Sequence, residues 1–236
     1  SDEAAAGIGA RVTSPALWAR GLRSLDAVLV THGDLDHAGG MAAVIDDFRP
    51  RWLWMGIDVP SHPVSRRLSD VARRTGTPQR WLQAGMSWTW GGVTVRTLHP
   101  PEPDWERTRV RNDDSVVLVL QYGDVALLLT GDAGEAVERA VLAQLPAASI
   151  RLLKAGHHGS ATATSAALLD GWRPTAVFVS AGRGNRFGHP SPVVMRRLLG
   201  RGMAVWRTDR HGQVTVDIEP HTVRVRTWAP PDGGGT

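Results

Sequence analysis

The stretch "THGDLDHAGG", residues 31–40, places two histidines and two aspartates within six positions. The apolar run "DAVLV" comes directly before it and glycines close it, so we expect a strand to end here and a helix to follow. His32 and Asp34 lie two positions apart in extended chain, which places their side chains on the same side. Asp36 and His37 come where the chain turns into the helix and can point back into the same space. Imidazole and carboxylate groups in this pattern predict a metal site.

Two later loops carry the same kinds of side chain after apolar strands. "LLLTGDAGE" (127–135) contains Asp132, and "LLKAGHHGS" (152–160) contains His157 and His158. The carboxyl ends of strands collect the ligand-binding loops of α/β proteins. Carboxylates and imidazoles gathered at one point need a cation between them to offset desolvation and repulsion. The three loops together therefore predict one shared metal centre.

Each residue also has an ordinary structural interpretation. Asp36 and Asp132 can each cap the helix that follows, and a single histidine in a loop is more often a surface residue than a ligand. The order of the three motifs, each at a strand end, favours the metal site over these separate explanations.

The composition narrows the class of protein. The chain has 236 residues, of which 42% are hydrophobic and 21% charged, as in ordinary globular proteins. No apolar run reaches the ~18 residues that a membrane span requires. Without cysteine, disulfides and thiolate ligands are excluded. The net charge is +4 and nearly all basic residues are arginine, which suits phosphate contacts; a composition bias is the alternative explanation.

Short apolar runs alternate with amphipathic segments, which predicts the α/β class. We expect "SPALWARGL" (14–22) to be a helix capped by Ser14, and Gly123-Asp124 to turn a hairpin. We expect one domain over residues 1–229 and a flexible tail over 230–236. Further strands are expected at 26–31, 51–55, 115–122, 125–130, 150–155 and 175–180, and further helices at 39–48, 65–76, 133–145, 165–172 and 192–202.

These motifs resemble those of the metallo-β-lactamase superfamily, and within it the domain found in ComEC-type competence proteins, which import DNA. The resemblance covers roughly residues 20–217. It is carried by "LDAVLVTHGDLDHAGGM", "NDDSVVLVL", "LLLTGDAGEAVE", "LLKAGHHGSATATS", "NRFGHPSP" and "RRLLGRGMAVWRTDRHGQVTV". It implies an αββα sandwich that binds two divalent metal ions.

The resemblance also implies a role for each ligand. His32 and Asp34 would hold the first metal ion, and Asp36 and His37 the second. Asp132 would bridge both ions. His158, which directly precedes a glycine, fits the last ligand better than His157, although the order of the two stays open.

The sequence departs from the superfamily pattern in three places. Asp34 replaces the middle histidine of the usual HxHxDH signature. No histidine occurs in "RVRNDDS" (109–115), where the superfamily has one; His62 is expected in a surface loop, and an oxygen of Asn112, Asp113, Asp114 or Ser115 can serve instead. The first site is therefore rich in oxygen, which predicts Mn²⁺ in preference to Zn²⁺. Only 31 residues precede His32, so the first strands of the N-terminal sheet are expected to be missing.

The resemblance implies a metal-dependent phosphodiesterase that uses its metal pair to activate water and degrades the DNA strand that is not transported. Catalytic roles fall to Asp36, Asp132 and His189; His189 would protonate the leaving group or contact phosphate, unless it only packs beside Pro190. We expect phosphate contacts from Ser160, Arg183, Asn185, Arg186 and His189, and a rim formed by Arg107, Arg109 and Arg111. Solvated arginines are the alternative.

The resemblance further implies that DNA is bound through its phosphate backbone, without regard to sequence. It implies that the chain belongs to a larger membrane channel protein, as a soluble domain on the outer side of the bacterial inner membrane. Two other functions remain open: hydrolysis of small esters or nucleotides on the same metal pair, and DNA or partner binding by a domain whose metal site has decayed.

Overall fold

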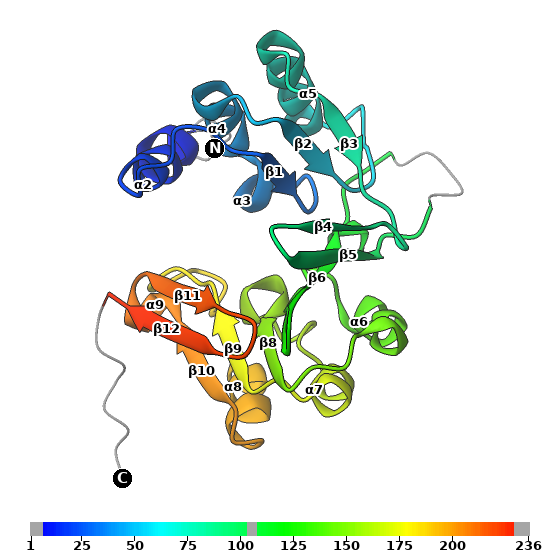
Figure 1. The fold of residues 1–236 in the computed structure, drawn as a ribbon, viewed down its shortest axis with the longest axis vertical. Coiled ribbons are helices and arrows are strands. Elements are labelled where there is room, and N and C mark those ends of the chain that lie inside the picture. Colours follow the sequence, from blue (N-terminus) through cyan, green and yellow to red (C-terminus); the bar gives the residue numbers. More distant parts are fainter. Residues whose placement is uncertain (1–6, 103–107, 229–236) are drawn as a thin grey trace. The chain divides into compact units, whose positions relative to one another are not determined.

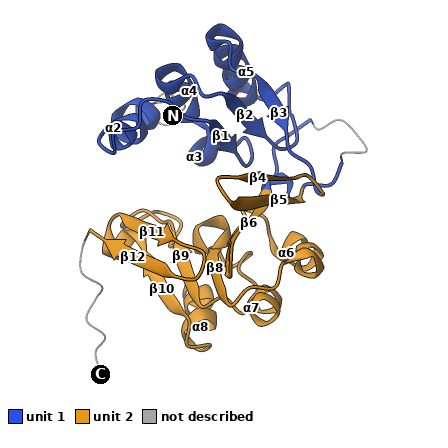
Figure 2. Cartoon of the chain, in the orientation of Figure 1, with its two compact units in different colours: residues 1–84, 100–116 blue, residues 85–99, 117–236 orange. Residues whose placement is uncertain are grey.

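The computed structural model describes residues 7–102 and 108–228, so residue 229 and the predicted tail 230–236 lie outside the described residues. The chain divides into two compact units (Figure 2). Unit 1 comprises residues 1–84 and 100–116, and unit 2 comprises residues 85–99 and 117–236. The expected single domain over 1–229 stays a prediction.

Unit 1 contains a three-stranded parallel sheet of order β1-β2-β3, built from β1 (Ala27–Val30), β2 (Trp52–Met55) and β3 (Gln79–Trp81). Three helices connect the strands: α3 (Leu35–Ala38) and α4 (Met41–Phe48) after β1, and α5 (Pro63–Thr75) after β2 (Figure 1). Apolar residues of α4, α5 and the strands form one core. Parallel strands need crossover connections of this kind. The HxDxDH loop belongs to the first of them and lies directly after β1.

The start of unit 1 corrects one prediction. Ser14 does not cap a helix, because a π-helix over Gly9–Thr13 runs directly into α2 (Ser14–Trp18) and the residue before Ser14 already has helical dihedral angles. Ser14 is buried inside the continuous helix. Among residues 7–26 the structure contains no strand.

Unit 2 contains a seven-stranded mixed sheet of order β10-β9-β8-β7-β6-β5-β4. Its antiparallel half consists of β4 (Ser87–Trp90), β5 (Val93–His99), β6 (Val117–Tyr122) and β7 (Val125–Leu129). The predicted hairpin at Gly123-Asp124 joins β6 to β7. The parallel half continues from β7 through β8 (Ile150–Lys154), β9 (Ala176–Val179) and β10 (Ala204–Arg207).

The two faces of this sheet are covered differently. Alternate residues of the strands, such as Leu128 and Leu153, pack with α6 (Glu135–Val141), α7 (Ala166–Trp172) and α8 (Pro192–Leu199). Their neighbours on the opposite face, such as Leu152, pack under the hairpin of β11 (Val214–Ile218) and β12 (Val223–Thr227). The parallel strands therefore bring the loops after β7, β8, β9 and β10 to one edge of unit 2.

Candidate metal centre

His32 is the second residue after β1 and directly follows Thr31. It is buried, with 7% of its surface exposed. Its Nδ1 lies 3.0 Å from Thr31 Oγ1 and 3.2 Å from Ser115 Oγ, while Nε2 faces Asp34 Oδ2 at 3.5 Å. Asp34 is the residue before α3, yet its side chain makes no capping hydrogen bond. Two hydroxyls thus hold one side of the imidazole, and the other side faces a carboxylate.

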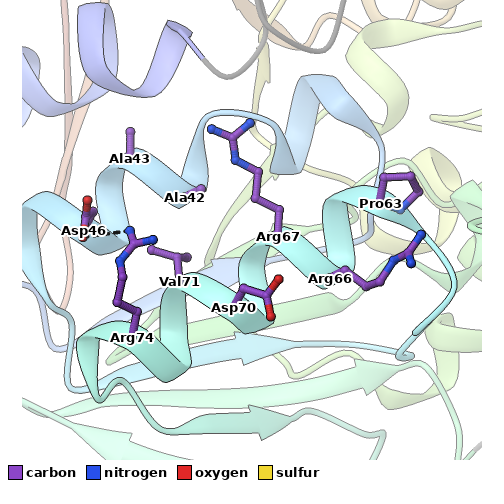
Figure 3. Close-up of a pocket in the computed structure, with 9 residues that line it drawn as sticks. All are labelled: Ala42, Ala43, Asp46, Pro63, Arg66, Arg67, Asp70, Val71 and Arg74. Carbon is purple, nitrogen blue, oxygen red and sulfur yellow. Dashed lines mark ion pairs between the residues drawn. The ribbon is translucent and has the colours of Figure 1, made fainter.

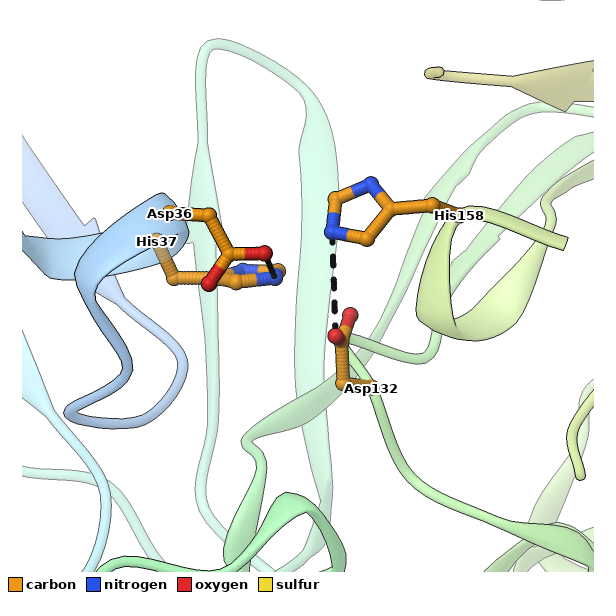
Figure 4. Close-up of side chains that lie close together, drawn as sticks. All are labelled: Asp36, His37, Asp132 and His158. Atoms are coloured by element: carbon orange, nitrogen blue, oxygen red, sulfur yellow. Dashed lines mark ion pairs between the residues drawn. The ribbon is translucent and has the colours of Figure 1, made fainter. Parts of the chain in front are cut away.

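Asp36 and His37 lie on α3, as the turn into a helix predicted (Figure 4). His37 Nε2 is 4.0 Å from Asp36 Oδ2, and His37 Nδ1 is 3.4 Å from Thr31 Oγ1. The rings of His32 and His37 are 4.4 Å apart, centroid to centroid. Asp36 lies within the helix and does not precede it, so the capping explanation does not apply. Unit 1 therefore gathers the predicted HxDxDH residues, and the Thr31 hydroxyl contacts both imidazoles.

In unit 2, the loop after β7 carries Asp132. This residue is 3% exposed. Oδ2 lies 3.7 Å from His158 Nε2 (Figure 4) and also 3.7 Å from His157 Nε2. Oδ1 lies 4.0 Å from Lys154 Nζ. The residue that precedes α6 is Gly134, so Asp132 does not cap that helix. A buried carboxylate surrounded by imidazoles and an ammonium is arranged to face positive charge.

His157 and His158 are adjacent residues of the loop after β8. Both have left-handed backbone conformations, with φ of 47° for His157 and 54° for His158. His158 Nδ1 lies 2.9 Å from the carbonyl oxygen of Ser180, so Nδ1–H donates and the Nε2 lone pair faces Asp132. His157 instead lies with its ring 5.9 Å from that of His189. Metal-binding histidines usually donate their second ring nitrogen in this way, which favours His158.

Two residues of unit 2 that support the candidate site were not identified from the sequence. Lys154, the only lysine, stands directly before the "AGHHGS" motif and reaches Asp132. Glu138 is 1% exposed within α6, and its carboxylate accepts hydrogen bonds from Thr164 N at 2.6 Å and Ser165 N at 2.8 Å. Burial raises the pKa of Glu138 above its usual range, against the effect of these hydrogen bonds. Glu138 anchors the chain that follows the histidines, although its sequence position indicates only a helix.

The predicted phosphate-binding residues of the loop after β9 have structural partners. Asn185 Oδ1 accepts a hydrogen bond from His189 N at 2.9 Å, and its Nδ2 donates to His189 O at 2.6 Å and Gly182 O at 2.8 Å. Asn185 therefore shapes the loop that carries His189. Arg183 Nε donates to Asp209 O at 3.4 Å, and the Arg186 guanidinium lies over the Phe187 ring. Their phosphate contacts stay predictions.

His189 and Ser160 lie close to His157 in unit 2: the His189 ring is next to the His157 ring, and Ser160 N donates a hydrogen bond to His157 O at 2.8 Å. Burial lowers the pKa of His189, and the neighbouring His157 and His158 lower it further, while Asp132 acts in the opposite direction. Ser160 is 8% exposed, and its hydroxyl lies 3.0 Å from Thr162 Oγ1. The roles predicted for both residues remain predictions.

Unit 1 holds the remaining residues singled out from the sequence. Arg109 and Arg111 are exposed, and Arg107 lies outside the described residues. His62 lies in the loop directly before α5, as expected, and is half-buried. A Cβ on Gly33 would lie 2.7 Å from Val110 Cγ2 and 3.4 Å from His62 Nδ1. Glycine at position 33 therefore lets the HxDxDH loop pack closely against Val110 and the residue before α5.

A groove of about 630 Å³ lies between α4 and α5 (Figure 3). Its arginines are balanced by acidic residues, since Arg74 pairs with Asp46 at 3.2 Å and Asp70 also lines the wall. Arg66 Nη2 donates to Ser61 O at 3.1 Å. Because none of the predicted ligands line this groove, we assign it no part in the metal centre. The full lining is Ala42, Ala43, Asp46, Pro63, Arg66, Arg67, Asp70, Val71 and Arg74.

Among the described residues, no helix combines the length and apolar character that crossing a membrane requires. This agrees with the absence of a long apolar run in the sequence.

Comparison with known proteins connects this fold to a family. The family model described as "Metallo-beta-lactamase superfamily" matches residues 2–183. Two solved structures of CmlA, a diiron β-hydroxylase, share the fold. One is the E377D mutant, with a TM-score of 0.51 at 14% identity, covering 88% of this chain and 45% of that one. The other, from Streptomyces venezuelae, has a TM-score of 0.50 at 13% identity, covering 88% and 46%. The predicted α/β metallo-β-lactamase fold is confirmed.

Curated relatives confirm the resemblance to ComEC-type proteins. ComE operon protein 3 of Bacillus subtilis is 30% identical over 88% of this chain and 26% of its own length. Recombination protein 2 of Haemophilus influenzae is 32% identical over 82% of this chain and 22% of its own length. Competence protein ComA of Neisseria gonorrhoeae is 29% identical over 84% and 26%. The chain thus spans about a quarter of the length of these relatives.

Proposed function

The chain belongs to the metallo-β-lactamase superfamily, and from this premise we propose that it is a metal-dependent phosphodiesterase that cleaves DNA. The observation that carries the proposal is the buried Asp132 facing two imidazoles, one of them aimed by the Ser180 carbonyl. The competence-related names of the relatives support DNA as the substrate class.

The residues present fit divalent cations. Asp36 and His37 of unit 1, and Asp132 and His158 of unit 2, are carboxylate and imidazole donors of the kinds that bind metal ions. We propose that these four hold one ion, that His32 and Asp34 hold a second, and that Asp132 serves both. The donors are carboxylate oxygens and imidazole nitrogens, because the chain has no thiolate. Carboxylate-rich sites of this kind favour Mn²⁺, and Zn²⁺ is the alternative.

Divalent ions at these residues would supply the positive charge that lowers the pKa of water and offsets charge on phosphate oxygens. The protein residues would do the rest. The exposed carboxylate of Asp36 can accept a proton from the attacking water. His189, held by Asn185, would donate a proton to the leaving oxygen or contact a phosphate oxygen. Ser160 and Arg183 would donate hydrogen bonds to the remaining phosphate oxygens.

The experiment is digestion of DNA by metal-stripped protein after addition of Mn²⁺ or Zn²⁺. We expect Mn²⁺ to restore cleavage in the wild type and Asp36→Ala to abolish it. Asp47→Ala, which removes an exposed carboxylate from α4 of the same unit, is the matched control and should cleave normally. Full recovery with Zn²⁺ and none with Mn²⁺ would refute the metal preference.

The same assay separates the alternatives. Hydrolysis of a small phosphodiester reporter without cleavage of plasmid DNA would indicate a hydrolase of small esters or nucleotides. Elemental analysis that finds no bound metal after incubation with Mn²⁺ would indicate a binding domain with a decayed site. Cleavage that is insensitive to salt would contradict backbone recognition, because each neutralised phosphate adds to the salt dependence.

The setting of the domain is also a proposal. We propose that it works as part of a larger membrane channel protein on the outer side of the bacterial inner membrane, where it degrades the strand that is not transported. The support is that relatives with competence-related names are about four times as long as the matched region. The side of the membrane can be tested by adding protease to intact spheroplasts. The protease should digest a domain on the outer side, whereas a protected domain would contradict the proposal.

A further inference from the structure

Phe187 is an exposed aromatic residue in the loop that carries His189. It is 66% exposed, whereas core packing would bury a phenylalanine. Its ring lies nearly parallel to that of His189, at an angle of 21° and a centroid distance of 5.9 Å. The guanidinium carbon of Arg186 lies 4.8 Å from the Phe187 centroid. The loop therefore presents three adjacent planar groups: a phenyl ring, an imidazole and a guanidinium.

A short series of contacts within unit 2 connects this surface to the candidate catalytic residues. The ring centroids of His189 and His157 are 5.9 Å apart. His157 Nε2 in turn lies 3.7 Å from Asp132 Oδ2. Phe187 is thus two side chains away from the buried carboxylate. A nucleotide whose phosphate lies at Asp132 would have its base within reach of this surface.

The backbone holds the surface in place. Asn185 makes three hydrogen bonds to Gly182 and His189 on either side of Phe187. Thr208 Oγ1 accepts a hydrogen bond from Ala181 N at 2.9 Å and lies 2.8 Å from Ala181 O. An aromatic ring held at a fixed place costs little entropy when a base stacks on it.

We propose that Phe187, extended by His189 and flanked by Arg186, is a stacking platform for one unpaired base of the DNA strand. This inference rests on the proposed function, because it places the base beside the bond that is cleaved. Every base has a flat π-face, so such a platform is insensitive to sequence, and a nearby guanidinium adds cation–π attraction. The platform would favour single-stranded or frayed DNA over a closed duplex.

The test is binding of a short single-stranded oligonucleotide and of a set in which a single abasic site is moved along the strand. Fluorescence anisotropy with Ca²⁺ in place of Mn²⁺ would report affinity. For the wild type we expect one position at which the abasic site weakens binding by a factor of about 5 to 150, the range that loss of one stacked base gives. Phe187→Ala should bind intact and abasic strands equally at that position.

Two further variants define the role of the ring. Phe187→Trp should keep the position-dependent loss, and Phe187→Leu, which retains an apolar side chain without a π-face, should lose it. If Phe187→Ala fails to fold, Phe187→Leu makes the same test. Leu199→Ala is the matched control, since Leu199 is an exposed apolar residue of unit 2 at the end of α8, and it should behave as the wild type.

The outcomes separate this inference from the proposed function. If wild type binding shows no position-dependent loss, or if Phe187→Ala retains it, the platform is wrong even where Mn²⁺-dependent cleavage is normal. If the loss is present in the wild type and absent in Phe187→Ala, the platform is supported. In that case an absence of cleavage counts against the nuclease proposal alone.

Discussion

His158 Nδ1 lies 2.9 Å from the carbonyl oxygen of Ser180, and this contact turns Nε2 of the same ring toward Asp132 Oδ2 at 3.7 Å. The adjacent His157 also reaches Asp132 at 3.7 Å, so distance to the carboxylate does not distinguish the two histidines. The Ser180 carbonyl fixes the tautomer of His158 with its lone pair on Nε2, an arrangement that is usual for a metal-binding histidine.

We therefore predict different effects of removing each histidine. His158→Ala should weaken Mn²⁺ binding by more than about 10–100-fold, which is what loss of an outer-shell partner alone typically costs. His157→Ala should reduce affinity by less. Isothermal titration of metal-stripped protein with Mn²⁺ measures both. A larger effect from His157→Ala would reverse the ligand assignment.

Ser115 is predicted to orient His32. Its hydroxyl lies 3.2 Å from His32 Nδ1, and the side chain is fully buried. Ser115→Ala should reduce metal affinity about 10–100-fold, the usual cost of losing a residue that orients a ligand. Ser61→Ala, which removes an exposed hydroxyl from the same unit, serves as the control. Unchanged affinity in Ser115→Ala would show that Thr31 suffices to hold the ring.

Glu138 is predicted to stabilise the loop after the histidines. In Glu138→Gln, one of the N–H groups of Thr164 and Ser165 loses its acceptor, which we expect to reduce the free energy of unfolding by about 1–3 kcal/mol. Glu135→Gln, an exposed position on the same helix, should cost less than about 1 kcal/mol. Urea denaturation measures both variants. Equal effects would contradict an anchoring role for Glu138.

The ion pair of Arg207 and Asp209 predicts a dependence of stability on pH. The two Arg207 nitrogens lie 3.0 and 2.6 Å from the Asp209 oxygens, and they hold the pKa of Asp209 below its usual value of 3.8. A carboxyl whose pKa is lowered by folding stabilises the protein above the unfolded value, and this stabilisation is lost as pH falls through the folded value.

Asp209→Asn should accordingly reduce the free energy of unfolding by about 1.5–3 kcal/mol at neutral pH, the range for hydrogen bonds to charged groups. The difference from the wild type should shrink as pH falls below 3.8. Asp170→Asn is the control: Arg201 also lowers the pKa of Asp170, but that carboxylate is 66% exposed and water screens the pair. A difference that is independent of pH would contradict the prediction.

The sequence predicted the strands and helices well because their patterns are local. Apolar strands followed by motif loops were found where expected, and the helix predicted to end at Gly76 does so with φ of 70° at that glycine. The wrong start at Ser14 has a physical reason: serine followed by proline is typical of a helix N-terminus, but here the preceding residues are already helical.

The histidines and aspartates of the candidate site were likewise visible in the sequence, because they follow apolar strands in three separate loops. Their supporting contacts were not visible, because they join residues distant in the chain. Ser115 is 83 positions from His32, Ser180 is 22 positions from His158, and Glu138 reaches Thr164 across 26 positions. Only the fold brings these partners together.

We propose that two divalent ions share Asp132. Metal analysis combined with electron paramagnetic resonance of the Mn²⁺-loaded protein tests it most directly. We predict two bound Mn²⁺ per chain with an exchange-coupled spectrum, and loss of the coupling in Asp132→Ala. One uncoupled Mn²⁺ per chain, or a spectrum that Asp132→Ala leaves unchanged, would contradict the account.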